Sequence, residues 1–211
     1  MWVYFHHMKP TFTANDLFGS KGRIDVLRSL WGVAVPLTAA EVARRARMTH
    51  PAVTTILRSL ARQGLVGSSP AGRGHTYWML KDNAYVERFL DPVFSSERDL
   101  PDVMLDELSR ELEPSAVSVV LFGSYARGDQ TADSDVDIAV VTADESAKKS
   151  VEDTLVTFGD RFERRFGARL SPLVYDRKEA AQLADRSPSL WQSLRDDGVT
   201  VSGLGVDEWR R

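Results

Sequence analysis

One stretch near the middle of the chain constrains its fold more than any other. The run Val117–Val120 is apolar and β-branched, which is typical of a buried strand, and Leu121–Gly128 follows it directly. Within that segment, Gly123 and Ser124 predict that the strand ends in a tight turn before a helix begins. Glycine lets a ligand approach the backbone, and free N–H groups at a helix start attract negative charge. The stretch therefore predicts a pocket for phosphate.

Two acidic residues open a second apolar run shortly after this turn. Asp135 and Asp137 alternate with Val136, so in a strand both carboxylates face the same side, about 7 Å apart. Two neighbouring acids repel each other unless a hard ion such as Mg²⁺ or Mn²⁺ bridges them. A phosphate pocket beside a divalent-metal site is the minimum apparatus for phosphoryl or nucleotidyl transfer. The simpler alternative is a solvated acidic turn.

The order of these motifs resembles the polymerase-beta-like nucleotidyltransferase superfamily, and especially its minimal nucleotidyltransferases. Their signature is Gly-Ser, then Ala-Arg-Gly, then Ser-Asp-x-Asp, and every element of it is present between Gly123 and Asp137. The resemblance covers residues 117–201. It implies metal-binding and catalytic roles for Asp135 and Asp137. It also implies a nucleoside triphosphate, bound by Gly123, Ser124, Arg127 and Ser134.

The resemblance is incomplete on a later strand. Active members carry a third carboxylate there, near the position of Ser171 or Pro172, and neither residue can replace it. Asp176 lies a few residues later, so a shift or bulge in the strand would be needed to bring it to the site. Asp176 is therefore a candidate third catalytic carboxylate. The competing interpretation, which we favour, is that Asp176 caps a helix that begins at Arg177.

Charge is divided unevenly along the chain. Residues 1–81 contain 11 Lys and Arg but only 3 Asp and Glu, whereas the rest contains 16 basic and 27 acidic residues. This division predicts two modules, the first with an anionic partner.

Cysteine is absent, which rules out disulfides and thiolate metal sites and favours a reducing cytosol. No apolar run approaches the ~20 residues that span a bilayer, and the N-terminus lacks a secretory pattern, so we expect a cytoplasmic protein without a membrane partner.

The basic part of the chain shows three helical patterns followed by two strands. Ile24 to Trp31 carries apolar residues at helical spacing, Thr38 to Glu41 is a capping box that opens a second helix, and Thr49-His50-Pro51 opens a third. A hairpin loop is expected at 68–75, with the returning strand at 76–80. This order resembles the winged-helix regulators of bacteria and archaea.

In a winged helix-turn-helix the third helix enters the major groove and the wing lies along the DNA backbone. Six residues on these elements are candidate contacts to double-stranded DNA: His50, Thr54, Thr55, Arg58, Arg62 and Arg73. The alternative is a winged helix used only for protein contacts, with its arginines forming a solvated face.

The predicted fold class is α+β, with an N-terminal winged helix-turn-helix and a C-terminal nucleotidyltransferase α/β domain built on a small mixed sheet. We expect an N-terminal extension, a winged helix-turn-helix, a helical connector and a nucleotidyltransferase-like domain, at residues 1–20, 21–81, 82–114 and 115–211.

Two segments offer apolar surface beyond the expected cores. One is the connector, which we expect to be interrupted near Pro92 and Pro101, and the other is the aromatic N-terminus with Trp2, Tyr4 and Phe5. We therefore expect a homodimer held mainly by these segments.

Two functions stay open. The first is a DNA-binding protein whose Mg²⁺-dependent domain transfers a nucleoside monophosphate from a triphosphate such as ATP to a hydroxyl. Because minimal nucleotidyltransferases often act as antitoxins that adenylylate a toxin, the resemblance makes a toxin-type protein the candidate acceptor. The second is a winged-helix transcriptional regulator whose transferase-like domain binds nucleotide, or holds a dimer, without catalysis.

Overall fold

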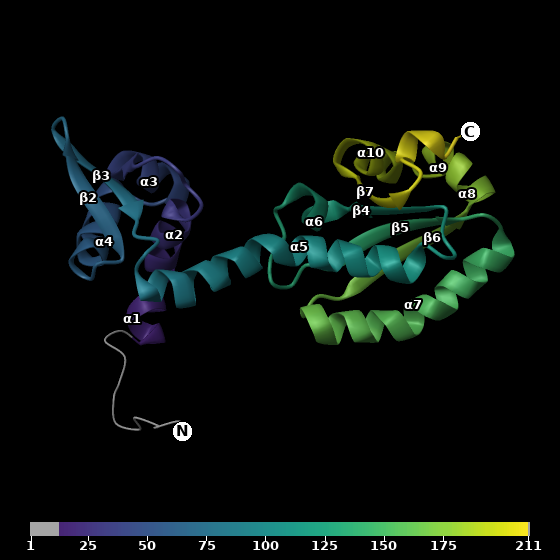
Figure 1. Ribbon diagram of the computed structural model, residues 1–211. Coiled ribbons are helices and arrows are strands. Elements are labelled where there is room, and N and C mark those ends of the chain that lie inside the picture. Colours follow the sequence, from purple (N-terminus) through teal and green to yellow (C-terminus); the bar gives the residue numbers. More distant parts are fainter. Residues whose placement is uncertain (1–12, 211) are drawn as a thin grey trace, which may run out of the picture. The chain divides into compact units, whose positions relative to one another are not determined.

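The computed structural model describes residues 13–210 and divides into two compact units, Met1–Asp99 and Leu100–Arg211 (Figure 1). The aromatic residues of the predicted N-terminal dimer surface lie outside the described residues. Within residues 13–210, no helix is both long enough and apolar enough to cross a membrane.

The first unit consists of short helices and a small sheet. Its elements, in chain order, are α1 (Ala14–Phe18), α2 (Lys21–Leu30), β1 (Leu37–Thr38), α3 (Ala39–Ala46), α4 (His50–Arg62), β2 (Val66–Ala71), β3 (Gly74–Met79), the π-helix η1 (Val86–Leu90) and the first part of α5 (Asp91–Leu112).

Local sequence signals start two of these helices. The capping box before α3 is confirmed, since the Thr38 hydroxyl accepts from the Glu41 N–H at 3.3 Å and the Glu41 carboxylate accepts from the Thr38 N–H at 2.7 Å. A proline lies in the first turn of α4, where a missing N–H costs nothing. Both helices begin where the sequence predicts.

The sheet of this unit has the strand order β1-β3-β2, and both pairings are antiparallel. The predicted hairpin loop at 68–75 is too long, because pairing continues to Ala71 and Gly74 and leaves only a two-residue turn. The extra strand residues were not predicted because they are mostly polar. Where both faces of a ribbon are exposed, its backbone can pair without apolar side chains. Pro70 fits because β2 is an edge strand.

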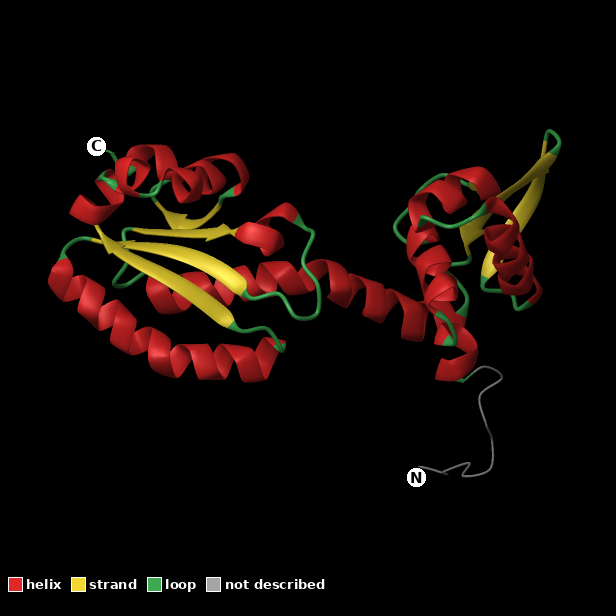
Figure 2. Cartoon of the chain, turned by 180° about the vertical axis from the view of Figure 1, so that it is seen from behind, coloured by secondary structure: helices red, strands yellow, loops and turns green. Residues whose placement is uncertain are grey.

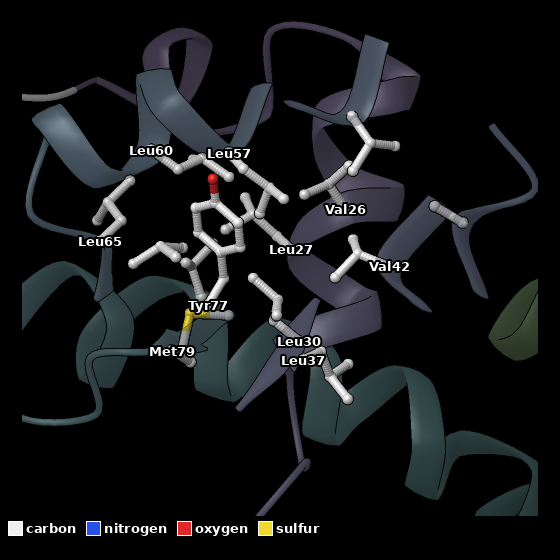
Figure 3. Close-up of a cluster of buried hydrophobic side chains, with 14 of the residues drawn as sticks. Val26, Leu27, Leu30, Leu37, Val42, Leu57, Leu60, Leu65, Tyr77 and Met79 are labelled. Atoms are coloured by element: carbon white, nitrogen blue, oxygen red, sulfur yellow. The ribbon is translucent and has the colours of Figure 1, made fainter. Parts of the chain in front are cut away.

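The core of the first unit lies between the helices and one face of β3 (Figure 3). Leu27 of α2, Val42 of α3 and Leu57 of α4 are fully buried, and Tyr77 of β3 packs among them. Leu17 of α1 also belongs to this core, so residues 13–20 of the expected extension are part of the folded unit.

The connector was expected to be interrupted near its two prolines, and this expectation is wrong for Pro101. Helix α5 runs without interruption from Asp91 to Leu112 and includes Pro101. The π-helix η1 ends at Leu90, so the regular α-helical hydrogen bonding is interrupted directly before Pro92, while Pro101 removes one hydrogen bond from an exposed part of the helix. Burial of Phe94 before Pro101 and of Leu108 after it offsets that loss.

The second unit is an α/β arrangement that contains the rest of α5. Its further elements are β4 (Ser118–Phe122), α6 (Gly123–Arg127), β5 (Val136–Thr142), α7 (Glu145–Phe166), β6 (Leu170–Asp176), α8 (Arg177–Ala181), α9 (Leu183–Arg186), α10 (Pro188–Asp197), β7 (Val199–Gly203) and the 3-10 helix η2 (Val206–Glu208). Helix α7 is a single helix of 22 residues, whereas α8 and α9 are two short helices separated by Gln182.

The sheet of the second unit has the order β6-β5-β4-β7, with β5 and β6 parallel and the other pairs antiparallel. The predicted small mixed sheet is therefore confirmed. Helices α5 and α7 cover one face, and α8, α9 and α10 cover the other (Figure 2). Ile138 of β5 is buried on the first face and Ala139 on the second, so β5 is apolar on both sides once past Asp137.

Candidate functional site

The Gly-Ser turn brings the backbone against one of the two candidate metal ligands. Strand β4 ends at Phe122, which pairs with Asp137 of β5, and Gly123 then turns the chain with a φ of 73°. A Cβ on Gly123 would collide with the Asp137 carboxylate oxygen Oδ2. Glycine is therefore required twice, for its left-handed backbone and for the space next to Asp137.

Asp135 and Asp137 lie at the start of β5. Asp135 immediately precedes the strand and is exposed, while Asp137 is its second residue and is half-buried. In the described part of the chain, neither carboxylate has a hydrogen-bonded or ion-paired partner. Two negative groups two residues apart, with no cation to balance them, form a site of negative potential beside the Gly123 turn.

These two carboxylates fit one kind of metal site and not another. Residues 13–210 contain no group of three or more acidic or histidine side chains that could hold an ion alone. Mg²⁺, however, is usually bound by one or two carboxylates, with phosphate oxygens and water completing its shell. Asp135 and Asp137 therefore suit an ion that arrives together with the phosphates of a nucleotide.

The candidate third carboxylate does not reach this site. In the parallel pairing of β5 and β6, Ser171 is opposite Asp137, whereas Asp176 is opposite Thr142. Five residues of extended strand separate the two positions, which is about 16 Å. The register of β6 therefore contradicts the prediction that Asp176 acts as a catalytic carboxylate beside Asp137.

Asp176 instead caps α8, as the competing interpretation held. Its carboxylate accepts from the Glu179 N–H at 2.7 Å, and the Glu179 carboxylate accepts from the Asp176 N–H at 3.0 Å. Lys148 of α7 reaches the same Glu179 carboxylate at 2.7 Å. The hydrogen bond from Lys148, followed by that from the Asp176 N–H, holds the pKa of Glu179 below its ordinary value.

Arg127 and Ser134, two candidate nucleotide-binding residues, already have partners. The Arg127 guanidinium donates to Asp129 at 3.2 Å and lies 3.7 Å from Asp197 of α10, and the bond to Asp129 raises its pKa. The Ser134 hydroxyl accepts from the Thr131 N–H at 2.9 Å and closes the turn before β5. Asp197 was not a candidate, because no local pattern connects it with a residue so far away in the sequence.

The candidate DNA contacts gather on α4 and on the turn between β2 and β3. His50, Arg58 and Arg62 are exposed on α4, and Arg73 is exposed between Gly72 and Gly74. Within the described residues, none of these three arginines has an ion-pair partner.

The two candidate threonines on α4 make bonds within their own helix. Thr54 donates to the His50 carbonyl at 2.9 Å, and Thr55 donates to the Pro51 carbonyl at 3.1 Å. Their hydroxyl oxygens stay available as acceptors.

Two solved structures show weak likeness to the chain. A toxin–antitoxin complex with AMP-PNP is 23% identical with a TM-score of 0.34, covering 51% of this chain and 78% of that one. The archaeal chromatin protein TrmBL2, reported with a novel mode of DNA binding, is 18% identical with a TM-score of 0.27, covering 73% of this chain and 62% of that one.

Sequence similarity is more informative for the second unit. A protein of Methanocaldococcus jannaschii that bears the name "Putative protein adenylyltransferase" is 29% identical over 79 residues, which are 37% of this chain and 71% of that protein. The family model described as Nucleotidyltransferase domain matches residues 103–191, a stretch that contains the Gly123 turn, Asp135 and Asp137. Residues 103–191 are thus a nucleotidyltransferase domain.

Proposed function

We propose that the nucleotidyltransferase domain binds a nucleoside triphosphate together with Mg²⁺ and transfers its nucleoside monophosphate to a hydroxyl of another molecule. The observation that carries this proposal is the pair of unpartnered carboxylates, Asp135 and Asp137, beside the tight Gly123 turn within the matched domain. Two carboxylates that lack a cationic partner can bind Mg²⁺. The glycine turn beside them leaves room for the phosphates that this ion would carry.

Each residue of the site has a separate task in this proposal. Gly123 lets the phosphates approach the backbone, and the half-buried Ser124 adds a hydroxyl. Asp135 and Asp137 hold the ion, which would neutralise charge on the phosphates when bound. Arg127 already pairs with Asp129 and Asp197, and its fork of donors can exchange one of them for a phosphate oxygen.

The acceptor that we propose is a protein, and the nucleotide is ATP. The similarity to a protein named as a protein adenylyltransferase supports both choices. A toxin-type partner is the acceptor that the resemblance to minimal nucleotidyltransferases favours.

One observation favours a second function, which is nucleotide binding without transfer. Ser171 is opposite Asp137 on β6, where a carboxylate could complete the metal shell or accept the proton of the attacking hydroxyl. Asp176 is engaged as a helix cap and cannot replace it.

A labelling experiment separates the two functions. The full chain is incubated with Mg²⁺, ATP labelled in the adenosine part and a cell extract as the source of acceptors, and label in protein is measured. Transfer requires labelling that is lost in Asp137→Asn and kept in Asp153→Asn, which removes the same charge from an exposed residue of α7. Binding without transfer predicts no labelling by the wild-type chain, while calorimetry still shows Mg²⁺-dependent ATP binding.

Ser171→Asp refines the same experiment. If the third ligand limits catalysis, this variant labels protein faster than the wild type, because it restores a carboxylate opposite Asp137. Absence of any Mg²⁺-dependent ATP binding by the wild-type chain would contradict both functions.

We infer that the first unit is a winged helix-turn-helix that binds double-stranded DNA through α4 and the β2–β3 turn. Three helices followed by a two-stranded ribbon, with unpaired arginines on α4 and at the turn, support this inference. The test is fluorescence anisotropy of the full chain with a labelled duplex, and affinity should fall steeply as salt rises. No measurable affinity at low salt would contradict it.

We further propose that the chain forms a homodimer. Helix α5 exposes Val93, Leu100 and Val103, and winged-helix proteins commonly bind paired half-sites as symmetric dimers. Light scattering at micromolar concentration should give twice the mass of the chain, and Leu100→Asp should shift it toward the monomer. A monomeric mass for the wild type would refute the proposal.

A further inference from the structure

An open cavity of about 620 Å³ lies in the first unit, between α2 and the turn that connects α3 to α4. Its wall contains four basic residues, Lys21 and Arg28 of α2 and Arg45 and Arg47 near the end of α3, and one acidic residue, Asp25. Trp31 adds an aromatic surface. The volume falls within the range of pockets that hold small organic ligands.

The four cations of this wall are not equivalent. Arg28 binds Glu97 through two bonds of 2.8 and 2.9 Å, and Lys21 lies 2.7 Å from Asp25, so these charges are balanced. Arg45 and Arg47 are exposed and have no ion-pair partner in the described part of the chain. Glu41, one helical turn before Arg45, offsets part of this charge, and the α3 side of the cavity remains positive.

Arg47 adopts a backbone conformation that favours glycine. It ends α3 with φ 52° and ψ 43°, and it is the one non-glycine residue with positive φ among residues 13–210. Glycine is the usual residue at such a position, because a Cβ there is strained. An arginine at this point contributes a charged side chain at the cavity that glycine could not.

We propose that this cavity binds a phosphate group, held by the guanidinium groups of Arg45 and Arg47. Arginine suits this ligand because its planar fork can bind two phosphate oxygens at once. The site is separate from the candidate DNA contacts on α4. The phosphate has two sources that share this chemistry, the backbone of bound DNA and the polyphosphate chain of a free nucleotide.

Two variants and a control test the proposal in the full chain. Arg47→Gly removes the guanidinium and relieves the left-handed backbone, so its melting temperature should be equal to or above that of the wild type. Arg45→Gln removes the second charge from an exposed position. Arg88→Gln is the control, because it removes the same charge from an exposed residue of η1 outside the cavity lining.

Two probes distinguish the sources of phosphate. The first is a labelled DNA duplex, titrated at several salt concentrations. The second is tripolyphosphate in the presence of EDTA, measured by calorimetry. EDTA removes divalent ions and so prevents metal-dependent phosphate binding at the candidate site of the second unit.

The outcomes are distinct. If DNA supplies the phosphate, Arg47→Gly and Arg45→Gln each weaken duplex binding and reduce the salt dependence by about one ion, beyond the effect of Arg88→Gln. If a free polyphosphate is the ligand, tripolyphosphate binds the wild type and the control but neither cavity variant. If both variants match the control with both probes, the proposal is overturned, while DNA binding through Arg58 is unaffected by that result.

Discussion

The two units place their candidate functional residues in different relation to the fold. In the first unit, Arg58 lies on the exposed face of α4, while Val53 and Leu57 on the opposite face form the core. In the second unit, Gly123 and Asp137 lie where β4 and β5 pair, so the candidate site and the turn of the backbone share the same residues. Binding and folding should therefore separate in the first unit and be coupled in the second.

Gly123→Ala should have the largest effect and shows the coupling most directly. Positive φ and a collision with the Asp137 carboxylate act together, so we expect the free energy of unfolding to fall by about 2 kcal/mol and Mg²⁺-dependent ATP binding to disappear. Chemical denaturation and calorimetry measure the two quantities. Gly159→Ala is the matched control: it lies within α7 with open space around its Cβ, and it should gain stability by about 0.5–1 kcal/mol. Unchanged stability and binding in Gly123→Ala would show that folding and binding are not coupled in the second unit.

Asp137→Asn separates the effect of charge from the effect of shape at the candidate site. The amide occupies nearly the same volume, so the turn at Gly123 should persist while ATP affinity in Mg²⁺ falls at least about tenfold, because one ligand of the ion is lost. Removal of one of two like charges should leave the free energy of unfolding equal or slightly higher. The prediction fails if affinity is retained, or if it is lost equally without the metal.

Arg58→Ala tests the opposite behaviour in the first unit. Loss of one unpaired arginine from α4 should weaken duplex binding by about 1–3 kcal/mol if it contacts a base, while the melting temperature stays the same. Anisotropy titrations and thermal denaturation measure both.

Arg73→Ala should likewise weaken binding, with a shallower salt dependence if Arg73 contacts a phosphate. A variant that melts early would show that binding and folding are coupled here as well.

Substitution of Asp176 tests the edge of the second unit that lies away from the candidate site. Asp176→Ala removes a helix cap and should lower the free energy of unfolding by about 1 kcal/mol, whereas Asp176→Asn keeps an acceptor and should be nearly neutral. ATP affinity should not change in either variant, because the register of β6 separates Asp176 from Asp137. Lost nucleotide binding in Asp176→Asn would instead place this carboxylate in the site.

The smallest predicted effect concerns pH and the pair formed by Lys148 and Glu179. The pKa of Glu179 is lowered in the folded chain, mainly by its hydrogen bond from Lys148, so its contribution to stability is present above its ordinary pKa of 4.5 and is lost as the pH falls below it. The pKa of Lys148 is raised by the same bond, so its contribution is lost only at strongly alkaline pH. Lys148→Met should therefore cost about 0.5 kcal/mol at pH 7 and less at pH 3. Denaturation curves at the two pH values would contradict this if the difference grew in acid.

Signals that act within a few residues were sufficient for much of the local structure. The capping box at Thr38 and the cap at Asp176 each depend on groups three positions apart, and each is observed as predicted. The Gly123-Ser124 turn after an apolar strand is of the same kind. Such features are visible in the sequence because their energetics are nearly complete within one helical turn or one strand end.

Features that depend on distant residues were decided only by the tertiary structure. The resemblance placed the third carboxylate near Ser171 or Pro172, but the sequence could not exclude a shift or bulge that brings Asp176 to the site, because strand register results from pairing between segments that are remote in the chain. It also could not place Asp197 beside Arg127, nor keep α5 helical through Pro101, since both depend on packing that no local pattern records. The motif residues and the turn after β4 were thus predictable from local sequence, whereas the pairing of β5 with β6 determines which carboxylates can act together.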